Sequence, residues 1–489
     1  MYPDFNTFKT LADKGNLIPV YREILADADT PVTAYLKIGG SPSFLLESVE
    51  GGEKWARYSF IGSRPSRSIR GKGSIVEIID SGAAPQVITT DDPMSIVKQE
   101  ISRYRPVEIP GLPRFFGGLV GYIGYDMVQY FETLDMKEKK GLGLPDFFLM
   151  VTDTMLIFDN LRQKIKVISN AHIEGQSPEE AYQEATEKIN ALIGQLRTPL
   201  VMNNDSGAGK KNDLASNQTR EEFMSSVEAA KEYIKAGDVF QVVLSQRFSR
   251  PSSADPFNIY RALRVINPSP YMYFIDIGDA KIVGSSPEIL VRLEGSRIVL
   301  RPIAGTRRRG ETEEEDRALE KELKEDPKEV AEHIMLVDLG RNDVGRVSKA
   351  GSVQMTEMMA VERYSHVMHL VSNVEGELQE GLNAFDVLGA CFPAGTVSGA
   401  PKVRAMEIIN ELEPTKRGPY AGSVGYFSYS GNMDTCITIR TLIIKDGTIY
   451  VQVGAGIVAD SQPASEYTET VNKAGGMIKA IDMAEEGLG

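Results

Sequence analysis

The sequence contains few of the residues that serve covalent or soft-metal chemistry. Only two cysteines, Cys391 and Cys436, and four histidines occur among 489 residues. Both cysteines have apolar or small neighbours, which is typical of buried core thiols and not of a metal or redox site. Four histidines give little basis for a histidine-based zinc site, whereas a hard metal held by carboxylates stays open.

Positive charge and long apolar runs are also scarce. The 54 Lys and Arg residues stand against 68 Asp and Glu, a net charge of -14, which is the wrong sign for a surface that follows phosphate backbones. No run approaches the ~18 apolar residues of a membrane span. The first residues, MYPDFNTFKTLADKG, lack the basic start and apolar stretch of a signal peptide. We therefore expect a cytoplasmic protein that binds neither nucleic acid nor membranes.

The composition and length predict a globular chain with more than one structural region. Hydrophobic residues make up 42% and charged residues 25%, enough to bury a large core. Residues 196–219 collect Asn, Asp, Ser, Gly and Lys without apolar periodicity, which indicates a linker or mobile loop. Thr219 and Glu222 then form a capping-box pattern for a helix that runs to about Ala236. We expect a strand-rich region over 1–195, the linker over 196–219 and a second domain over 220–489.

Alternating apolar stretches separated by Gly, Pro and Asp predict strands on both sides of the linker. Helices are predicted over 313–340, 383–391, 401–412 and 463–482. Because short turns join most strands, we expect an α+β fold with large antiparallel β-sheets packed together and flanked by helices. The predicted strands lie within 32–38, 43–49, 117–125, 147–159, 239–248, 271–277, 281–293, 297–305, 425–430, 435–445 and 448–458.

Two carboxylate pairs recur at helical spacing. Asp326 and a following proline predict a helix start, after which Glu329 and Glu332 share one face. Near the carboxyl end, Glu466 and Glu469 repeat the spacing. Each pair alone is also explained by a solvated helix face. If the two helices face each other, four clustered carboxylates need a cation, and all-oxygen ligation suits Mg²⁺.

Two glycine-containing segments have the backbone for close ligand approach. The loop 395–399 leads through a proline into a helix, which suits either anion binding or ordinary helix entry. The segment 454–459, GAGIVA, matches the start of a dinucleotide fingerprint. Only thirty residues follow it and they predict a single helix, so we do not expect a nicotinamide-binding oxidoreductase.

Two charged residues occur within apolar sequence. Arg440 is an isolated charge in a predicted strand, and a buried guanidinium needs either a structural carboxylate or a substrate carboxylate. Glu288 follows a predicted turn, where burial would raise its pKa and suit it as a general acid. The alternative for Glu288 is an exposed strand glutamate.

Taken together, these segments strongly resemble the chorismate-utilising enzymes, and among them the large subunits of anthranilate synthases. The resemblance covers nearly all of 220–480, and 44–62 and 117–126 extend it to most of the chain. The motifs that carry it are GDVFQVVLSQRF, GSSPEILVR, RPIAGTRRRG, EVAEHIMLVDLGRNDVGRV, YSHVMHL, FPAGTVSGAPK, YAGSVGYFSY, IRT, VGAGIVADS, SEYTETVNKAGGM, FLLESVEGGEKWARYSFIG and GGLVGYIGYD.

The resemblance implies a metal-dependent reaction. Glu332 and Glu469 would ligate Mg²⁺ directly, Glu329 and Glu466 would act through its waters, and the metal would hold the ring carboxylate of chorismate. Ammonia would attack ring carbon 2 with loss of the hydroxyl, and pyruvate would then leave. The implied catalytic residues are Glu288 as general acid, His369 in a supporting role in the elimination, Thr396 and Gln241; the implied substrate-binding residues are Tyr420, Arg440, Gly454, Ala455, Gly456, Lys473, Ala304, Gly305 and Thr306.

Two positions distinguish among the relatives. Gln241 stands where isochorismate and salicylate synthases carry a lysine that activates water, so the nucleophile should be ammonia. Ala304 stands where aminodeoxychorismate synthases typically carry a nucleophilic lysine, which favours anthranilate as the product. The alternatives are an aminodeoxychorismate synthase and a catalytically silent tryptophan-sensing protein.

The resemblance also implies an inhibitor and a partner. Neither cysteine lies in a nucleophile turn, so ammonia from glutamine requires a separate glutamine amidotransferase subunit, anthranilate synthase component II, and a hetero-oligomer. A tryptophan site remote from the metal would use Glu47 for the ammonium and apolar walls for the indole. The alternative for this site is a plain strand end and proline turn. Its implied residues are Glu47, Ser48, Pro270, Tyr271 and Met272.

Overall fold

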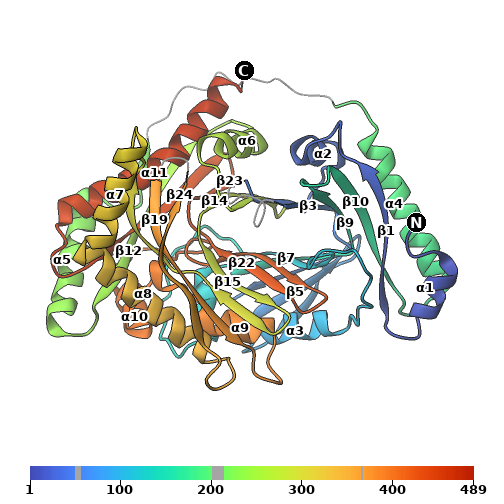
Figure 1. Cartoon of the computed structure of the whole chain (residues 1–489), viewed down its shortest axis with the longest axis horizontal. Helices are drawn as coiled ribbons and strands as arrows, with labels where there is room; N and C mark the ends of the chain where they lie inside the picture. Colours follow the sequence, from blue (N-terminus) through green and yellow to red (C-terminus); the bar gives the residue numbers. More distant parts are fainter. Residues whose placement is uncertain (50–56, 201–213, 365–366, 489) are drawn as a thin grey trace.

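The computed structural model describes residues 1–49, 57–200, 214–364 and 367–488. In this part of the chain two twelve-stranded antiparallel sheets form the centre, and helices lie around the outside (Figure 1). Buried residues of both sheets, such as Phe44 and Ile275 from one and Val120 and Leu149 from the other, share one apolar cluster. The sheets therefore pack against each other, and the predicted α+β class is confirmed.

The first sheet runs through residues from both ends of the chain. Its strand order is β1 (Leu17–Leu25), β10 (Lys164–His172), β9 (Thr154–Asp159), β3 (Tyr58–Ser63), β2 (Ser43–Glu47), β13 (Tyr271–Asp276), β14 (Ala280–Ser286), β23 (Thr441–Lys445), β24 (Thr448–Ile457), β12 (Gln241–Pro251) and β11 (Ala215–Ser216), with β20 (Gly399–Ala400) beside β12.

The second sheet also combines strands from both parts of the chain. Its strand order is β17 (Ile303–Arg308), β19 (Val367–Glu377), β16 (Arg297–Leu300), β15 (Ile289–Glu294), β22 (Met433–Ile437), β21 (Ser423–Ser428), β7 (Gly118–Ile123), β8 (Phe147–Thr152), β4 (Arg67–Lys72), β5 (Ile75–Asp80) and β6 (Gln86–Thr89), with β18 (Gln354–Arg363) beside β19.

The helices cover the outer faces of these sheets. Helix α4 packs on β10, α6 on β14 and α11 on β24, whereas α8 packs on β17 and β19. None of the helices in the described ranges is both long and apolar enough to cross a membrane. The helices are α1 (Phe5–Leu11), α2 (Pro31–Ile38), α3 (Pro93–Ser102), η2 (Tyr125–Tyr130), α4 (Pro178–Leu196), α5 (Arg220–Ala236), α6 (Pro256–Ile266), α7 (Glu313–Glu325), α8 (Pro327–Gly345), α9 (Ala384–Cys391), η3 (Gly395–Val397), α10 (Lys402–Leu412) and α11 (Pro463–Glu486).

The two regions predicted on either side of residues 196–219 share both sheets. Strand β2 pairs with β13, with Glu47 opposite Met272, and β7 pairs with β21. Residues 201–213 of the predicted linker, together with residues 50–56 and 365–366 of the family motifs, lie outside the described residues. Each region thus supplies strands that the other completes.

Local capping signals position the helices that matter most below. The Thr219 and Glu222 capping box is present at the start of α5, and α5 ends at Gly237, whose φ is 85°. Asp326 caps α8 by accepting hydrogen bonds from the backbone amides of Lys328 and Glu329. Both predicted helix starts are confirmed.

The prediction of a strand over residues 32–38 is wrong, because this segment forms helix α2. Thr30 and Thr33 form a capping box and Pro31 occupies the first turn, a combination that favours helix entry. Ala34, Tyr35 and Ile38 are buried together, as expected for spacings of three and four residues on one helix face.

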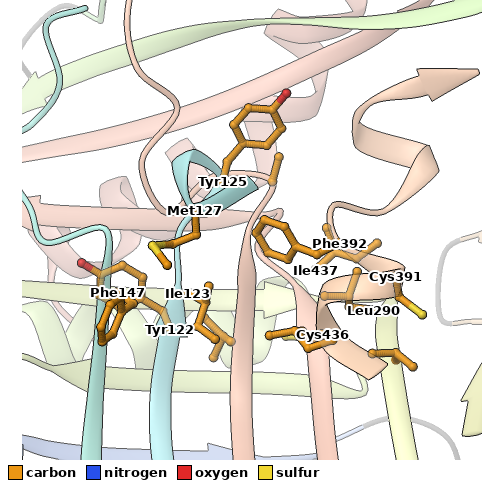
Figure 2. Packing of buried hydrophobic residues seen from close by; sticks show 14 of the residues in the cluster. Tyr122, Ile123, Tyr125, Met127, Phe147, Leu290, Cys391, Phe392, Cys436 and Ile437 are labelled. Carbon is orange, nitrogen blue, oxygen red and sulfur yellow. The ribbon is translucent and has the colours of Figure 1, made fainter. Parts of the chain in front are cut away.

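Both cysteines lie in the main apolar core. Figure 2 shows Cys391 and Cys436 near Leu290, Phe392 and Ile437. Both thiols are free and buried, and this burial raises the pKa of each thiol. They are core residues, as the sequence predicts.

Candidate active site

The predicted substrate-binding glycines lie where β24 runs beside β12. Gly456 is paired with Val243, and Gly454 with Ser245. A Cβ atom on Gly454 would lie 2.7 Å from the Tyr420 hydroxyl oxygen, and one on Gly456 would lie 2.5 Å from Nε2 of Gln241. A Cβ atom at either position would displace these side-chain ends, so the two glycines let Tyr420 and Gln241 lie against the β24 backbone.

The acidic residues of α8 and α11 surround one region. Gln241 Nε2 donates a hydrogen bond to Glu332 over 3.2 Å. Burial raises the pKa of both Glu332 and Glu466. Lys328 and Lys473 each interact electrostatically with both of these carboxylates, one lysine from each helix. The two predicted carboxylate pairs therefore approach each other across the two helices.

Basic side chains neutralise two of these carboxylates. Arg307 donates to Glu329 over 2.9 Å and to Asp326 over 2.7 Å, while Lys473 pairs with Glu469 over 2.6 Å. Across the described ranges, no three His, Cys, Asp or Glu side chains lie close enough to hold a metal ion. The carboxylates share a region, but with these ion pairs present they do not form a closed ligand set.

Arg440 is not inside a strand, contrary to the prediction. It lies between β22 and β23 with a φ of 52°, a left-handed conformation that few non-glycine residues adopt. Its Nη1 donates to the carbonyl of Lys473 over 3.1 Å. Burial lowers the pKa of Arg440, and no carboxylate of the described chain lies within ion-pair distance. The left-handed turn thus places a largely unneutralised guanidinium on the wall of a cavity.

Arg440 and Lys473 line an open cavity of ≈ 640 Å³ beside the start of α11. Lys473 Nζ also donates to the carbonyl of Gly454 over 3.1 Å. Its other polar lining residues are Arg220, Ser465, Thr468, Asn472 and the carboxylate-bearing Glu469, so three cationic side chains face one carboxylate. This concentration of cationic and hydrogen-bond-donating groups suits an anionic ligand.

Glu288 lies buried between β14 and β15, with only 8% of its surface exposed. Burial raises its pKa from 4.5 to about 8, although a hydrogen bond from Thr396 opposes the shift. The Thr396 hydroxyl donates to Oε1 over 3.0 Å and comes from the η3 turn of the predicted Gly/Thr/Ser loop. At neutral pH the Glu288 carboxyl is therefore protonated and able to donate a proton.

His369 on β19 is held by the PIAGT segment. Its Nδ1 lies 3.1 Å from the Gly305 carbonyl oxygen and 3.1 Å from the Thr306 hydroxyl. A carbonyl can only accept, so Nδ1 carries the proton and Nε2 has the free lone pair. Burial lowers the pKa of His369, which keeps the ring neutral. Gly305, with a φ of 68°, forms the irregularity between Ala304 and Thr306 that allows this contact.

Sequence reasoning missed Arg417, which connects several of these elements. This arginine is 2% exposed and pairs with Glu413 over 2.6 Å. It also donates to the carbonyls of Val397 and Val243, and its guanidinium lies 5.5 Å from the centre of the Tyr420 ring. Arg417 thus ties the Thr396 turn, strand β12 and Tyr420 together. In the sequence, Arg417 could have been noticed because it lies three residues before Tyr420, a predicted substrate-binding residue.

A separate cavity of ≈ 460 Å³ opens where β2 meets β13. The rings of Phe115 and Tyr426 stack there with centres 4.2 Å apart. Arg292 of strand β15, an isolated charge in apolar sequence that the sequence analysis missed, pairs with Asp434 over 2.9 Å in the cavity wall. All of the predicted inhibitor residues line this cavity: Glu47, Ser48, Pro270, Tyr271 and Met272.

The Glu47 carboxylate already has partners in this structure. The Tyr260 hydroxyl donates to it over 2.5 Å and the Arg264 guanidinium over 3.1 Å, both from α6. The side chain is only 2% exposed. A ligand ammonium would therefore share this carboxylate with α6, which connects the cavity to that helix.

Comparisons with known proteins agree with this geometry. A chorismate binding enzyme family model matches residues 42–479. The chain is 51% identical over 492 residues to anthranilate synthase component 1 of Acetivibrio thermocellus, covering 99% of both chains. It is 52% identical to the protein of the same name from Pseudomonas putida over 488 residues, covering 98% of each.

Solved structures give the same result. The crystal structure of anthranilate synthase component I from Streptococcus pneumoniae TIGR4 matches with a TM-score of 0.79 and 41% identity, covering 93% of this chain and 98% of that one. The menaquinone-specific isochorismate synthase MenF from Escherichia coli shares the fold, with a TM-score of 0.71, 19% identity and coverage of 97% and 98%. The chain therefore belongs to the chorismate-binding enzyme family and, within it, to the anthranilate synthase component 1 family.

Proposed function

We propose that the protein converts chorismate and ammonia to anthranilate and pyruvate, as the first step toward tryptophan in the cytoplasm. The names of the relatives support this product. The observation that carries the proposal is Glu288, a buried carboxyl whose pKa of about 8 keeps it protonated at neutral pH. Such a group can protonate the departing ring hydroxyl so that water leaves.

The other residues take complementary parts in this reaction. Arg440, Lys473 and Tyr420 bind the carboxylates of chorismate, and the Thr396 hydroxyl orients the acid. Gln241 has no basic group at neutral pH, so it does not activate water and ammonia is the nucleophile. The free Nε2 of His369 supports proton removal during pyruvate elimination.

We propose Mg²⁺ as the cofactor, held directly by Glu332 and Glu469 and through water by Glu329 and Glu466. The donor set fits, since hard carboxylate oxygens are the ligands Mg²⁺ prefers. Burial raises the pKa of Glu332 and of Glu466 and so disfavours their negative charge, which a divalent ion would stabilise. When bound, the ion supplies positive charge to a chorismate carboxylate. Its binding would replace the Arg307 and Lys473 ion pairs.

We further propose tryptophan as a feedback inhibitor and a glutamine amidotransferase subunit, component II, as the ammonia source. The cavity between β2 and β13 suits an indole because it combines stacked aromatic rings with apolar walls. The relatives are named anthranilate synthase component 1, and this numbering supports the existence of a second component. The chain's two cysteines are buried and so cannot serve as the nucleophile that hydrolyses the glutamine amide. This hydrolysis therefore needs another protein.

The test compares wild type with Glu332→Gln and Glu469→Gln, using Glu232→Gln on the exposed face of α5 as the matched control. Purified protein receives chorismate, ammonia and Mg²⁺, and pyruvate and fluorescent anthranilate are followed. We expect the first two variants to lose Mg²⁺-dependent turnover while tryptophan binding, measured by calorimetry, persists. Unchanged turnover rejects the metal assignment. Aminodeoxychorismate without pyruvate, or tryptophan binding without any wild-type turnover, selects one of the rival functions.

A further inference from the structure

Two charged residues of the family motifs have no part in the proposed reaction. Asp343 lies near the end of α8, in the motif EVAEHIMLVDLGRNDVGRV, and Lys402 begins α10, at the end of FPAGTVSGAPK. Lys402 Nζ lies 2.7 Å from Oδ2 of Asp343, although the two residues are 59 positions apart in the sequence. Lys402 is 9% exposed and Asp343 7%. The two motifs thus meet in a buried ion pair.

A buried ion pair such as this one is a poor source of stability. Taking both charges out of water costs free energy, and apolar residues of similar volume often stabilise a core as well or better. Burial raises the pKa of Asp343, while the nearby Lys402 opposes this shift. What the pair provides is position, because the ammonium and the carboxylate have to meet at one place, whereas apolar side chains pack in several ways.

The ion pair closes the loop that carries Thr396. Lys402 Nζ also donates to the carbonyl of Cys391 over 3.5 Å, so one ammonium group joins both ends of this loop to α8. Between these ends, a Cβ atom on Gly395 would lie only 2.1 Å from Cδ2 of Leu339 on α8. The η3 turn therefore packs directly on α8.

The same part of α8 borders the buried acid. A cavity of ≈ 20 Å³, enough for about one water, is lined by Glu288, Thr396 and Asp343. The Thr396 hydroxyl donates to Glu288 over 3.0 Å. Arg301 also lines the cavity and pairs with Glu362 over 2.6 Å, so its charge is compensated. The position of the η3 turn on α8 thus decides whether Thr396 reaches Glu288.

We propose that Lys402 and Asp343 are positioning residues for the general acid. Their ion pair holds the η3 turn on α8, so that the Thr396 hydroxyl stays within hydrogen-bond distance of Glu288 and the acid keeps one orientation. The inference rests on the proposed function, because Glu288 is a general acid only in that reaction. Neither Lys402 nor Asp343 exchanges a proton with the substrate.

The test removes both charges at once. The variant Lys402→Met/Asp343→Leu leaves no buried charge unpaired, so its Tm should stay near that of wild type. With chorismate, ammonia and Mg²⁺, we expect its kcat for anthranilate to fall at least about tenfold while KM for chorismate changes little. The matched control Asp338→Leu/Arg341→Met removes an exposed ion pair of α8, with a separation of 3.0 Å, and should keep the wild-type kcat.

The pKa of Glu288 gives a second readout, which needs no turnover. The hydrogen bond from Thr396 favours the ionised carboxylate and lowers this pKa, so losing the bond should raise the pKa by about one unit. Urea unfolding from pH 5 to pH 10, with and without Glu288→Gln, measures the folded-state pKa in each background. We expect Lys402→Met/Asp343→Leu to show the same increase as Thr396→Val, and the control to show none.

Two results would overturn the inference: a wild-type kcat in the Lys402→Met/Asp343→Leu protein, or a Glu288 pKa in that protein equal to the wild-type value. If this variant does not fold, the same two results in Lys402→Gln/Asp343→Asn decide, since a weaker, uncharged contact there replaces the ion pair. A wild-type protein that forms no anthranilate would reject the proposed function instead, and the Glu288 pKa would still show whether the pair positions this carboxyl.

Discussion

Replacing Glu288 by glutamine should stabilise the protein against unfolding at neutral and alkaline pH while it abolishes turnover. In the folded protein burial raises the Glu288 pKa from 4.5 to about 8. The unfolded chain gives up this proton near pH 4.5, whereas the folded chain keeps it to about pH 8. The stability that the protonated carboxyl contributes is therefore complete below pH 4.5 and is lost as the pH rises to about 8.

The size of the effect follows from the same shift. Each pH unit between the two pKa values costs the wild type about 1.4 kcal/mol, which amounts to about 5 kcal/mol above pH 8 and about 3 kcal/mol at pH 7. Glutamine preserves the shape and the acceptor for Thr396 without ionising, so the Glu288→Gln protein avoids this cost. It has no acidic proton to donate, so anthranilate formation should fall at least about a hundredfold.

The assay is urea unfolding of wild type, Glu288→Gln and Glu187→Gln at one-unit steps from pH 5 to pH 9, followed by fluorescence and circular dichroism. The difference in unfolding free energy between Glu288→Gln and wild type should grow steadily from pH 5 to pH 8 and then level off. The Glu187→Gln control, with its carboxyl at the surface, should show no such growth. A pH-independent difference for Glu288→Gln, or wild-type turnover in that variant, would refute the reasoning.

Two further substitutions probe the groups around the substrate. Arg440→Lys keeps the charge but loses the planar fork, so kcat/KM for chorismate should fall at least about tenfold in steady-state kinetics, with little change in Tm; an unchanged kcat/KM contradicts carboxylate binding by this residue. Arg417→Met leaves the buried Glu413 carboxylate without its partner, which should cost about 3–5 kcal/mol in thermal or urea unfolding. Arg404→Met, at an exposed pair on α10, is its control, and equal losses in the two variants would contradict the special role of the buried pair.

The sequence was most informative where a local rule decides the structure. Capping chemistry predicted the starts of α5 and α8, because Thr219 and Asp326 satisfy amides within three residues of themselves. Alternation of apolar residues likewise predicted most strands of the two sheets. It failed at residues 32–38, where Pro31 and the Thr30 cap should have outweighed a short apolar run that suits either helix or strand.

The candidate site depended on information that local patterns do not carry. Residue spacing put Glu329 with Glu332 and Glu466 with Glu469, but the approach of α8 to α11 results from the packing of two different sheets. The left-handed turn at Arg440 interrupts an apolar run that reads as one continuous strand. Arg417 gave no motif of its own, since its importance comes from carbonyls of β12 and η3 that are distant in sequence.

Because both parts of the chain contribute strands to each sheet, the protein cannot be divided into two independent fragments. Strand β13 lies beside β2, and β21 beside β7, so a fragment starting near residue 214 would present two long, bare strand edges to solvent. Such edges invite pairing with other molecules, and the fragment should aggregate. Cutting the gene in two would therefore yield insoluble fragments. When both fragments are expressed together, each supplies the strands that the other lacks.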